Sequence, residues 1–287
     1  MKIKMIQLIN KLGFLPHFNL MSKVNLRQST FHIPILHGVG YEHLFLPEKW
    51  MLDILPQVIQ FSHGCFLDVG VNTGQTLLKI KSINPEIKYV GFEPNISCVQ
   101  YTEMLVAKNS IKNVVIIPVA LSNQTGQSPL FLYSDKHTDS SASLVQSFRP
   151  GEKIFSQQIV NKSSLIEMEK KYPIPKIGIL KIDVEGVEYE VLDTCSDRIQ
   201  QDRPLIMLEI LPVYSMDNKD RWLRQQQIEK MLKDWNYVMY RVIKKNQSFI
   251  GLKKIETIGI HHDISQCDYV VCPIEKTTNL LFTKNDF

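Results

Sequence analysis

Three short segments of the chain place acids and glycines where a nucleotide-like ligand could bind. In the first, FLDVGVNTG, an apolar run reaches Asp68, and Gly70 and Gly74 bracket a turn before a helical pattern that starts at Gln75. Glycines allow a tight turn and close approach of a ligand, and a helix N-terminus offers free N–H groups. The segment therefore predicts the strand, turn and helix start that receive a nucleotide in an open α/β sheet.

This turn departs from the dinucleotide-binding pattern in two ways. That pattern is GxGxxG, whereas this chain has GxxxG with Asn72 in the middle. Asp68 would also put a negative charge beside a pyrophosphate, and it suits a ligand with an ammonium or sulfonium group instead. An NAD-dependent oxidoreductase is therefore a disfavoured alternative.

The second segment, VGFEPN, places Glu93 at the end of an apolar run about 20 residues after the glycine turn. In a doubly wound fold an acid at this distance accepts hydrogen bonds from ribose hydroxyls. We assign Asn95 of the same segment to the ligand site. Val119 and Ala120 follow the next run, and we expect backbone groups there to contact the base.

The third segment, LKIDVEG, places Asp183 at the carboxyl end of another apolar run, where open α/β sheets bind ligands. Lys181 lies two residues earlier and faces the same way in a strand. Glu185 follows, and Glu209 repeats the arrangement at the end of the next run. We expect function from these acids, whereas Glu188 is better explained as an acid that favours a helix N-terminus.

These segments belong to a regular alternation of apolar runs and helical patterns that begins at Cys65. Short, continuous apolar runs are typical of a parallel sheet buried on both faces, so the chain predicts a Rossmann-like α/β sandwich. The expected strands are Cys65–Val69, Tyr89–Phe92, Val114–Val119, Ile177–Ile182, Leu205–Ile210, Tyr237–Ile243 and Tyr269–Val271. The expected helices are Gln75–Ser82, Ser97–Asn109, Val187–Cys195 and Arg221–Trp235.

Residues 1–60 lack this alternation, and we expect them to form a helical and hairpin extension to a domain of residues 61–287. Met5, Leu8, Ile9 and Leu12 recur at helical spacing beside lysines, which favours a helix packed on its own domain over one at a membrane surface. Residues 31–40 suggest a strand and a glycine-rich turn, forming a hairpin. Residues 48–61 suggest a helix interrupted by Pro56.

A polar stretch, Ser134–Lys153, breaks the alternation, and such stretches are usually binding elements or lids. We expect it to shape an acceptor pocket together with the first 60 residues. Just before it, Leu130–Tyr133 could pair with Val119–Ser122 as a hairpin. His137 lies in this stretch and is only an outside candidate for catalysis.

Composition narrows the function classes. The 287 residues are 44% hydrophobic and 22% charged, with net charge +4, which is too weakly basic to indicate a nucleic-acid partner. Five cysteines without CxxC spacing predict reduced, mostly buried thiols and a cytoplasmic location. No apolar run is long enough for an integral membrane segment. We predict no metal site, although Asp183 and Glu209 could together hold a divalent ion.

Taken together, DVGVNTG, VGFEPN, LKIDVEGVEYEVL and RPLIMLEI resemble the FkbM family of S-adenosylmethionine-dependent methyltransferases over residues 64–212. The resemblance implies a class I methyltransferase fold, a three-layer sandwich around a mostly parallel seven-stranded sheet in the order 3-2-1-4-5-7-6. It implies O-methylation with S-adenosylmethionine as cofactor. It also implies site roles: the methionine moiety held by Asp68, Gly70, Asn72 and Gly74, the ribose held by Glu93, and the reaction centre faced by Asp183 and Glu185.

The sequence therefore predicts methyl transfer to a hydroxyl oxygen of a small-molecule or glycan substrate. A hydroxyl needs its proton removed, so we expect a carboxylate base, with Asp183 first and Glu185 and Glu209 beside it. Two further alternatives stay open. One is an RNA methyltransferase that uses Lys181, Asp183 and Glu209, and the other is a non-catalytic nucleotide-binding scaffold.

Overall fold

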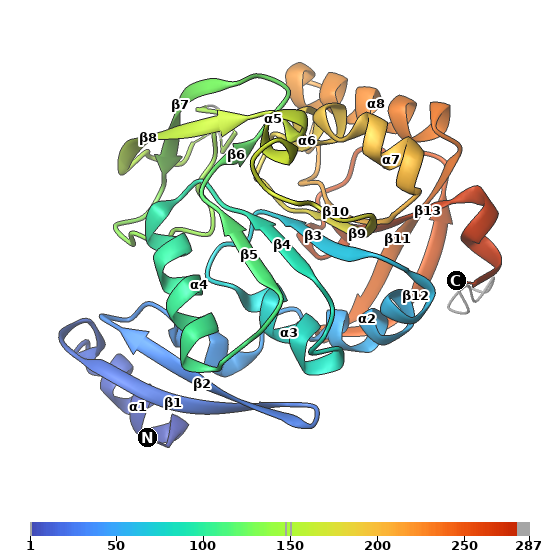
Figure 1. Cartoon of the computed structure of the whole chain (residues 1–287). Helices are drawn as coiled ribbons and strands as arrows, with labels where there is room; N and C mark the ends of the chain where they lie inside the picture. The colour runs from blue at the N-terminus through green and yellow to red at the C-terminus, as the bar shows by residue number, and fades with distance from the viewer. Residues whose placement is uncertain (1, 147, 150, 280–287) are drawn as a thin grey trace.

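The computed structural model of the protein describes residues 2–146, 148–149 and 151–279. In this part of the chain, an eight-stranded sheet lies between layers of helices, and two smaller sheets lie at its periphery (Figure 1). This arrangement confirms the predicted Rossmann-like α/β sandwich.

The central sheet contains one strand more than the seven expected. From one edge to the other, the order is β5 (Val114–Ile117), β4 (Tyr89–Phe92), β3 (Cys65–Val69), β9 (Ile177–Ile182), β10 (Leu205–Glu209), β13 (Asp268–Pro273), β11 (Tyr237–Lys245) and β12 (Ser248–Ile255). Neighbouring strands from β5 to β10 pair in parallel, whereas β13 is antiparallel to both of its neighbours. The extra strand, β12, pairs antiparallel with β11 at the edge of the sheet.

Without β12, the strands counted along the chain follow the order 3-2-1-4-5-7-6 implied by the family resemblance. Sequence reasoning missed β12 because it is an edge strand whose short apolar run, residues 249–252, is only partly buried and is flanked by exposed polar positions.

Helices bury apolar faces on both sides of the sheet. One core contains side chains from α2 (Lys49–Phe61) and α3 (Gln75–Ile83). The other contains side chains from α5 (Leu165–Glu169), α6 (Glu188–Thr194), α7 (Ser196–Asp202) and α8 (Lys219–Asp234). Figure 1 shows the two groups on opposite faces, with α4 (Ile96–Lys108) next to β5.

Helix α2 passes through Pro56 without a break, contrary to the predicted interruption. Proline has no N–H to donate to the carbonyl four residues earlier, which belongs to Leu52. The Arg27 guanidinium donates to that carbonyl at 3.4 Å, so the unpaired group has a partner from another element.

The N-terminal elements form a third core with α4. They are α1 (Ile3–Lys11), η1 (Leu15–His17), β1 (Asn19–Leu26), β2 (Ser29–Leu36) and η2 (Tyr41–Phe45). The predicted strand and turn are present, and Leu36 and Val39 exchange hydrogen bonds of 2.9 and 2.8 Å across the turn. The long hairpin of this segment, however, forms with the preceding β1, which pairs with β2 over its whole length. Of the four residues expected to pack α1 on the domain, only Ile9 does so, whereas Met5, Leu8 and Leu12 are exposed.

A small sheet beside the pocket described below has the order β6 (Ala120–Leu121), β8 (Ser156–Ser163), β7 (Gly126–Leu132). The predicted hairpin between Val119–Ser122 and Leu130–Tyr133 is therefore wrong, because β8 lies between β6 and β7 and pairs with both. Strand β8 was missed because its sequence, SQQIVNKS, is mostly polar, and four of its eight positions are exposed.

The remaining elements are η3 (Ile264–Gln266) and η4 (Ile274–Asn279). All five cysteines are free and buried, as predicted. Among the described residues, no helix combines the length and hydropathy needed to cross a membrane.

Candidate functional site

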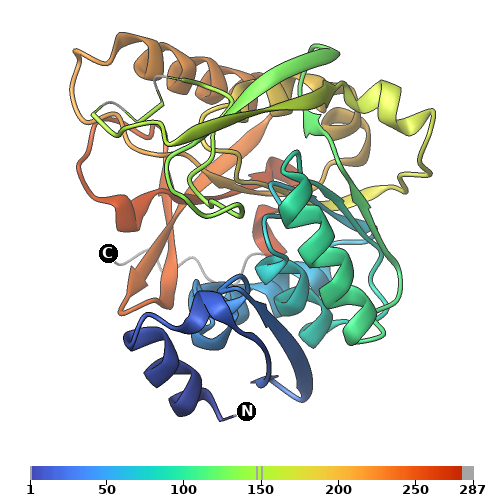
Figure 2. The same cartoon turned by 90° about the vertical axis from the view of Figure 1, so that its left-hand side faces the viewer.

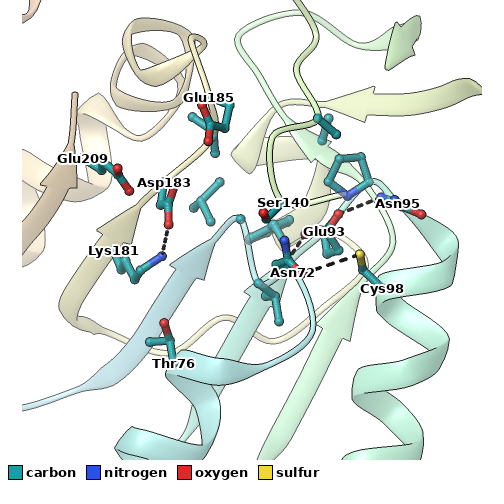
Figure 3. Close-up of a pocket in the computed structure, with 18 of the residues that line it drawn as sticks. Asn72, Thr76, Glu93, Asn95, Cys98, Ser140, Lys181, Asp183, Glu185 and Glu209 are labelled. Carbon is teal, nitrogen blue, oxygen red and sulfur yellow. Dashed lines mark hydrogen bonds and ion pairs between the residues drawn. The ribbon is translucent and has the colours of Figure 1, made fainter. Parts of the chain in front are cut away.

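A cavity of about 330 Å³ lies at the carboxyl ends of β3, β4, β9 and β10, where ligands bind in open α/β sheets. Figure 3 shows its lining side chains. Eight of the predicted site residues line it: Gly70, Asn72, Glu93, Asn95, Ala120, Asp183, Glu185 and Glu209.

The glycine turn after β3 lies against the loop after β9. Gly70 has a φ of +93°, and a Cβ there would approach the Asp183 carbonyl oxygen to 1.8 Å. Its N–H donates to the Phe92 carbonyl at 3.0 Å, which ties the turn to the end of β4. Only glycine allows the ends of β3 and β9 to approach this closely.

Glu93 is held by backbone groups on both sides. One carboxylate oxygen accepts the Asn72 N–H at 2.7 Å and the other accepts the Asn95 N–H at 2.8 Å. Burial raises the Glu93 pKa to about 7, although these N–H groups lower it. Each oxygen keeps a free lone pair, so the fixed carboxylate can still accept hydroxyls from a vicinal diol.

Asn95 joins α4 to the polar stretch Ser134–Lys153. Its side-chain oxygen accepts the Ser97 N–H at 3.1 Å as the N-cap of α4, and its amide donates to the His137 carbonyl at 2.8 Å. The His137 side chain is exposed, and this residue is not among those lining the cavity.

Asp68 and Gly74 are not among the residues that line the cavity. Gly74 is the N-cap of α3 with a φ of +82°. Asp68 is fully buried, accepts a hydrogen bond from the Tyr89 hydroxyl, and lies 3.6 Å from the Lys181 ammonium. Contact of these two residues with the methionine moiety stays a prediction. In the structure, Gly74 directly precedes helix α3 and Asp68 lies beside Lys181.

Lys181 connects the buried Asp68 to the cavity, because its ammonium also donates to Asp183 at 3.0 Å. Burial lowers the Lys181 pKa, but the negative charges of Asp183, Asp68 and Glu48 outweigh it and raise the pKa above its usual value. Lys181 is therefore a fixed cation that orients Asp183 (Figure 3).

The other two acids at this end of the cavity have raised pKa values. The negative charge of Asp183, followed by burial, raises the pKa of Glu209. Burial followed by the charge of Asp183 raises the pKa of Glu185 to about 7. The Arg149 guanidinium opposes this second shift, donating to both Glu185 oxygens at 3.0 and 2.9 Å.

The polar stretch Ser134–Lys153 forms one wall of the cavity through Asp139, Ser140, Ala142 and Leu144, as expected. Asp139 folds it locally by accepting the N–H groups of Tyr133, Ser134 and Ser141 at 2.6, 2.9 and 3.0 Å. The Ser143 hydroxyl donates to the Glu185 carbonyl at 2.6 Å. This wall is therefore attached to the acidic end of the cavity.

Sequence reasoning did not single out the lining residues Glu42, Pro47 and Glu48, although it expected the first 60 residues to shape the pocket. Glu48 pairs with the buried Lys79 ammonium at 2.8 Å, and Glu42 lies 3.7 Å from the Lys136 ammonium. No motif surrounds these acids, and only the packing of η2 and α2 brings them to the cavity.

The chemistry of the lining fits S-adenosylmethionine. Lys181 is the only basic side chain among the described residues that line the cavity, whereas seven lining residues are acidic: Glu42, Glu48, Glu93, Asp139, Asp183, Glu185 and Glu209. Such a lining favours a ligand with a positive ammonium and sulfonium and disfavours a pyrophosphate. Within the described ranges, no group of three or more His, Cys, Asp or Glu residues is placed to hold a metal ion.

Comparison with known proteins gives one family match. The model of the methyltransferase FkbM domain matches residues 68–239, which is more than half of the chain. No curated protein matches the chain.

Several solved structures match the chain at low identity. An FkbM methyltransferase from Methylobacillus flagellatus KT is 12% identical with a TM-score of 0.43, and the match covers 74% of this chain but only 43% of that one. A putative caffeoyl-CoA O-methyltransferase from Staphylococcus aureus is 11% identical with a TM-score of 0.43, covering 93% and 90%. A Pyrococcus abyssi tRNA (uracil-54, C5)-methyltransferase in complex with S-adenosyl-L-homocysteine is 11% identical with a TM-score of 0.37, covering 88% and 43%.

These structural likenesses are too distant to indicate a substrate, so the assignment rests on the family match. The chain belongs to the FkbM methyltransferase family, and its cofactor is S-adenosylmethionine.

Proposed function

We propose that this protein transfers the methyl group of S-adenosylmethionine to a hydroxyl oxygen of a small-molecule or sugar acceptor. The observation that supports this most is the group of Asp183, Glu185 and Glu209 at one end of the cavity, across from Glu93 (Figure 3). The arrangement separates the proposed diol-binding carboxylate from a group of acids that includes the proposed proton acceptor, Asp183.

In this proposal Glu93 binds the ribose hydroxyls, and the backbone of the turn from Gly70 to Asn72 lies along the rest of the cofactor. Ala120 and its neighbour Val119 contact the base. The bound cofactor supplies an electrophilic methyl group on a sulfonium. The nearby carboxylates stabilise the positive charge of the sulfonium. The wall formed by the stretch Ser134–Lys153 helps to orient the acceptor.

Asp183 is the proposed proton acceptor. The Lys181 ammonium donates a hydrogen bond to Oδ2 of Asp183 at 3.0 Å, which leaves Oδ1 of Asp183 to accept the proton of the acceptor hydroxyl. Glu209 lies within the field of Asp183, and two such carboxylates resist ionising together. The raised pKa of Glu209 keeps it protonated beside an ionised Asp183, so Asp183 is the carboxylate free to accept the proton. Glu185 is held by Arg149 and serves to position the wall.

Transfer of labelled methyl groups to small-molecule, glycan and RNA fractions tests this proposal. We expect label in the first two fractions, and we expect it to survive alkali, which cleaves methyl esters but not methyl ethers. Asp183→Asn should lower turnover by about 10²–10⁴-fold with cofactor affinity nearly unchanged. Asp197→Asn, at an exposed position on α7, is the matched control.

Label found only in RNA would support the RNA methyltransferase alternative instead. A chain that binds the cofactor but transfers no methyl group to any fraction would support the non-catalytic scaffold. Full activity of Asp183→Asn would contradict its role as the proton acceptor.

A further inference from the structure

Helix α1 and the turn that follows it expose a run of large apolar side chains. Met5, Leu8 and Leu12 are 50%, 56% and 59% exposed, and we call them the N-terminal apolar face. Phe14 and Phe18, on either side of η1, are also 55% and 46% exposed. Met5, Leu8 and Leu12 lie three and four residues apart, so they share one side of the helix. Figures 1 and 2 both place α1 at the outer edge of the molecule.

This face is not needed to hold the helix on the protein. Ile6 is fully buried, and Ile3 and Ile9 pack against the core that contains β1, β2 and α4. The helix therefore already has a buried side, and a second, solvent-facing apolar side is a feature that calls for a separate partner.

The charge of the surrounding segment identifies that partner. Residues 1–41 contain five Lys or Arg residues and no Asp or Glu, so this segment is more positive than the whole chain at +4. Lys2, Lys4 and Lys11 are exposed beside the face, and none of the ion pairs in the described part of the chain includes them.

We propose that the N-terminal apolar face binds the surface of an anionic lipid bilayer. Apolar side chains would enter the boundary between headgroups and acyl chains, while the flanking lysines would contact anionic headgroups. A second copy of this chain would bring the same positive charges together, which disfavours self-association. A nucleic acid would use the lysines but gain little from the apolar side chains.

Sedimentation of the full-length protein with lipid vesicles tests the proposal. We expect binding to phosphatidylcholine vesicles that contain phosphatidylglycerol, and weaker binding to phosphatidylcholine alone. The double variant Leu8→Ser and Leu12→Ser should lower the partition coefficient by at least about tenfold. Lys4→Gln should lower it by about fivefold on anionic vesicles only.

The matched control is the double variant Ile166→Ser and Ile264→Ser, which removes two other isoleucines that are each 62% exposed. It should bind vesicles like the unaltered protein, and unchanged circular dichroism melting should show that all variants fold. Equal vesicle binding by the Leu8 and Leu12 variant would overturn the proposal. So would a dimer that this variant dissociates, combined with no vesicle binding by the unaltered protein.

Discussion

At the scale of single residues, Glu93 is the side chain proposed to bind the ribose hydroxyls of the cofactor. Above the Glu93 pKa of about 7, Glu93→Gln replaces a charged acceptor with a neutral one, and it gives up a charge-assisted bond from at least one backbone N–H. We expect calorimetry to show S-adenosylmethionine binding about 10–100-fold more weakly, which corresponds to about 1.4–3 kcal/mol.

The control for this variant is Glu103→Gln, at an exposed position on α4. Unaltered affinity in Glu93→Gln would contradict the ribose assignment. Calorimetry with NAD provides a second comparison, for which we expect no binding, because the acidic lining would repel its pyrophosphate.

Glu188 illustrates how a buried acid next to the site affects stability. Burial raises its pKa to about 7, whereas a glutamate in an unfolded chain titrates near 4.3. Between these pH values the folded state binds more protons, so this residue's contribution to stability is lost as the pH rises.

Glu188→Gln should remove this dependence while keeping an oxygen that can accept the Gly186 N–H. Relative to this variant, the unaltered protein should lose up to about 1.4 kcal/mol of unfolding free energy per pH unit between about pH 4.5 and 7. Urea unfolding at several pH values measures this difference. Parallel pH profiles for the two proteins would show that Glu188 is not buried as a neutral acid.

At the scale of elements, the approach of the β3 turn to the β9 loop shapes the site. Gly70→Ala would force a methyl group onto the Asp183 carbonyl at a positive φ, so we expect a loss of about 2 kcal/mol or more in stability and weaker cofactor binding. Gly259→Ala has a similar φ of +74° but open space around it, and it should cost only about 1 kcal/mol with unchanged cofactor binding. Equal effects of both variants on denaturation and binding would refute the close approach.

The wall formed by the stretch Ser134–Lys153 depends on Arg149, which binds both oxygens of Glu185. Arg149→Gln should lower amide protection by roughly tenfold in residues 139–146 as measured by hydrogen exchange, because a charged hydrogen bond is lost. Lys170→Gln breaks an exposed ion pair with Glu167 and should leave exchange unchanged. Unchanged exchange in Arg149→Gln would mean that Ser143 and Asp139 suffice to hold the wall.

Sequence reasoning predicted the central elements well because their signals are local. The strands at Cys65–Val69, Tyr89–Phe92 and Ile177–Ile182 have the predicted bounds, since each is a continuous buried apolar run. β8 and β12 have no such run and take their place through pairing with neighbours distant in the sequence. The position of Asp68 behind Lys181 could not be predicted either, because it depends on the register of β3 against β9.

At the scale of the whole molecule, three parts of the chain meet at one cavity. The sheet supplies Glu93, Asp183 and Glu209, the polar stretch supplies a wall, and the N-terminal elements supply Glu42 and Glu48. The family match covers residues 68–239 and leaves the N-terminal elements outside. The acceptor preference of this protein is therefore expected to depend on parts of the chain beyond the shared domain.

The most direct test of the central claim is the NMR spectrum of the product made with ¹³C-methyl S-adenosylmethionine and a responsive acceptor fraction. The proposed function predicts a new methyl carbon bonded to oxygen, formed at similar rates by the unaltered protein and Asp197→Asn and at least about 100-fold more slowly by Asp183→Asn. A methyl carbon bonded to nitrogen, sulfur or carbon would contradict it.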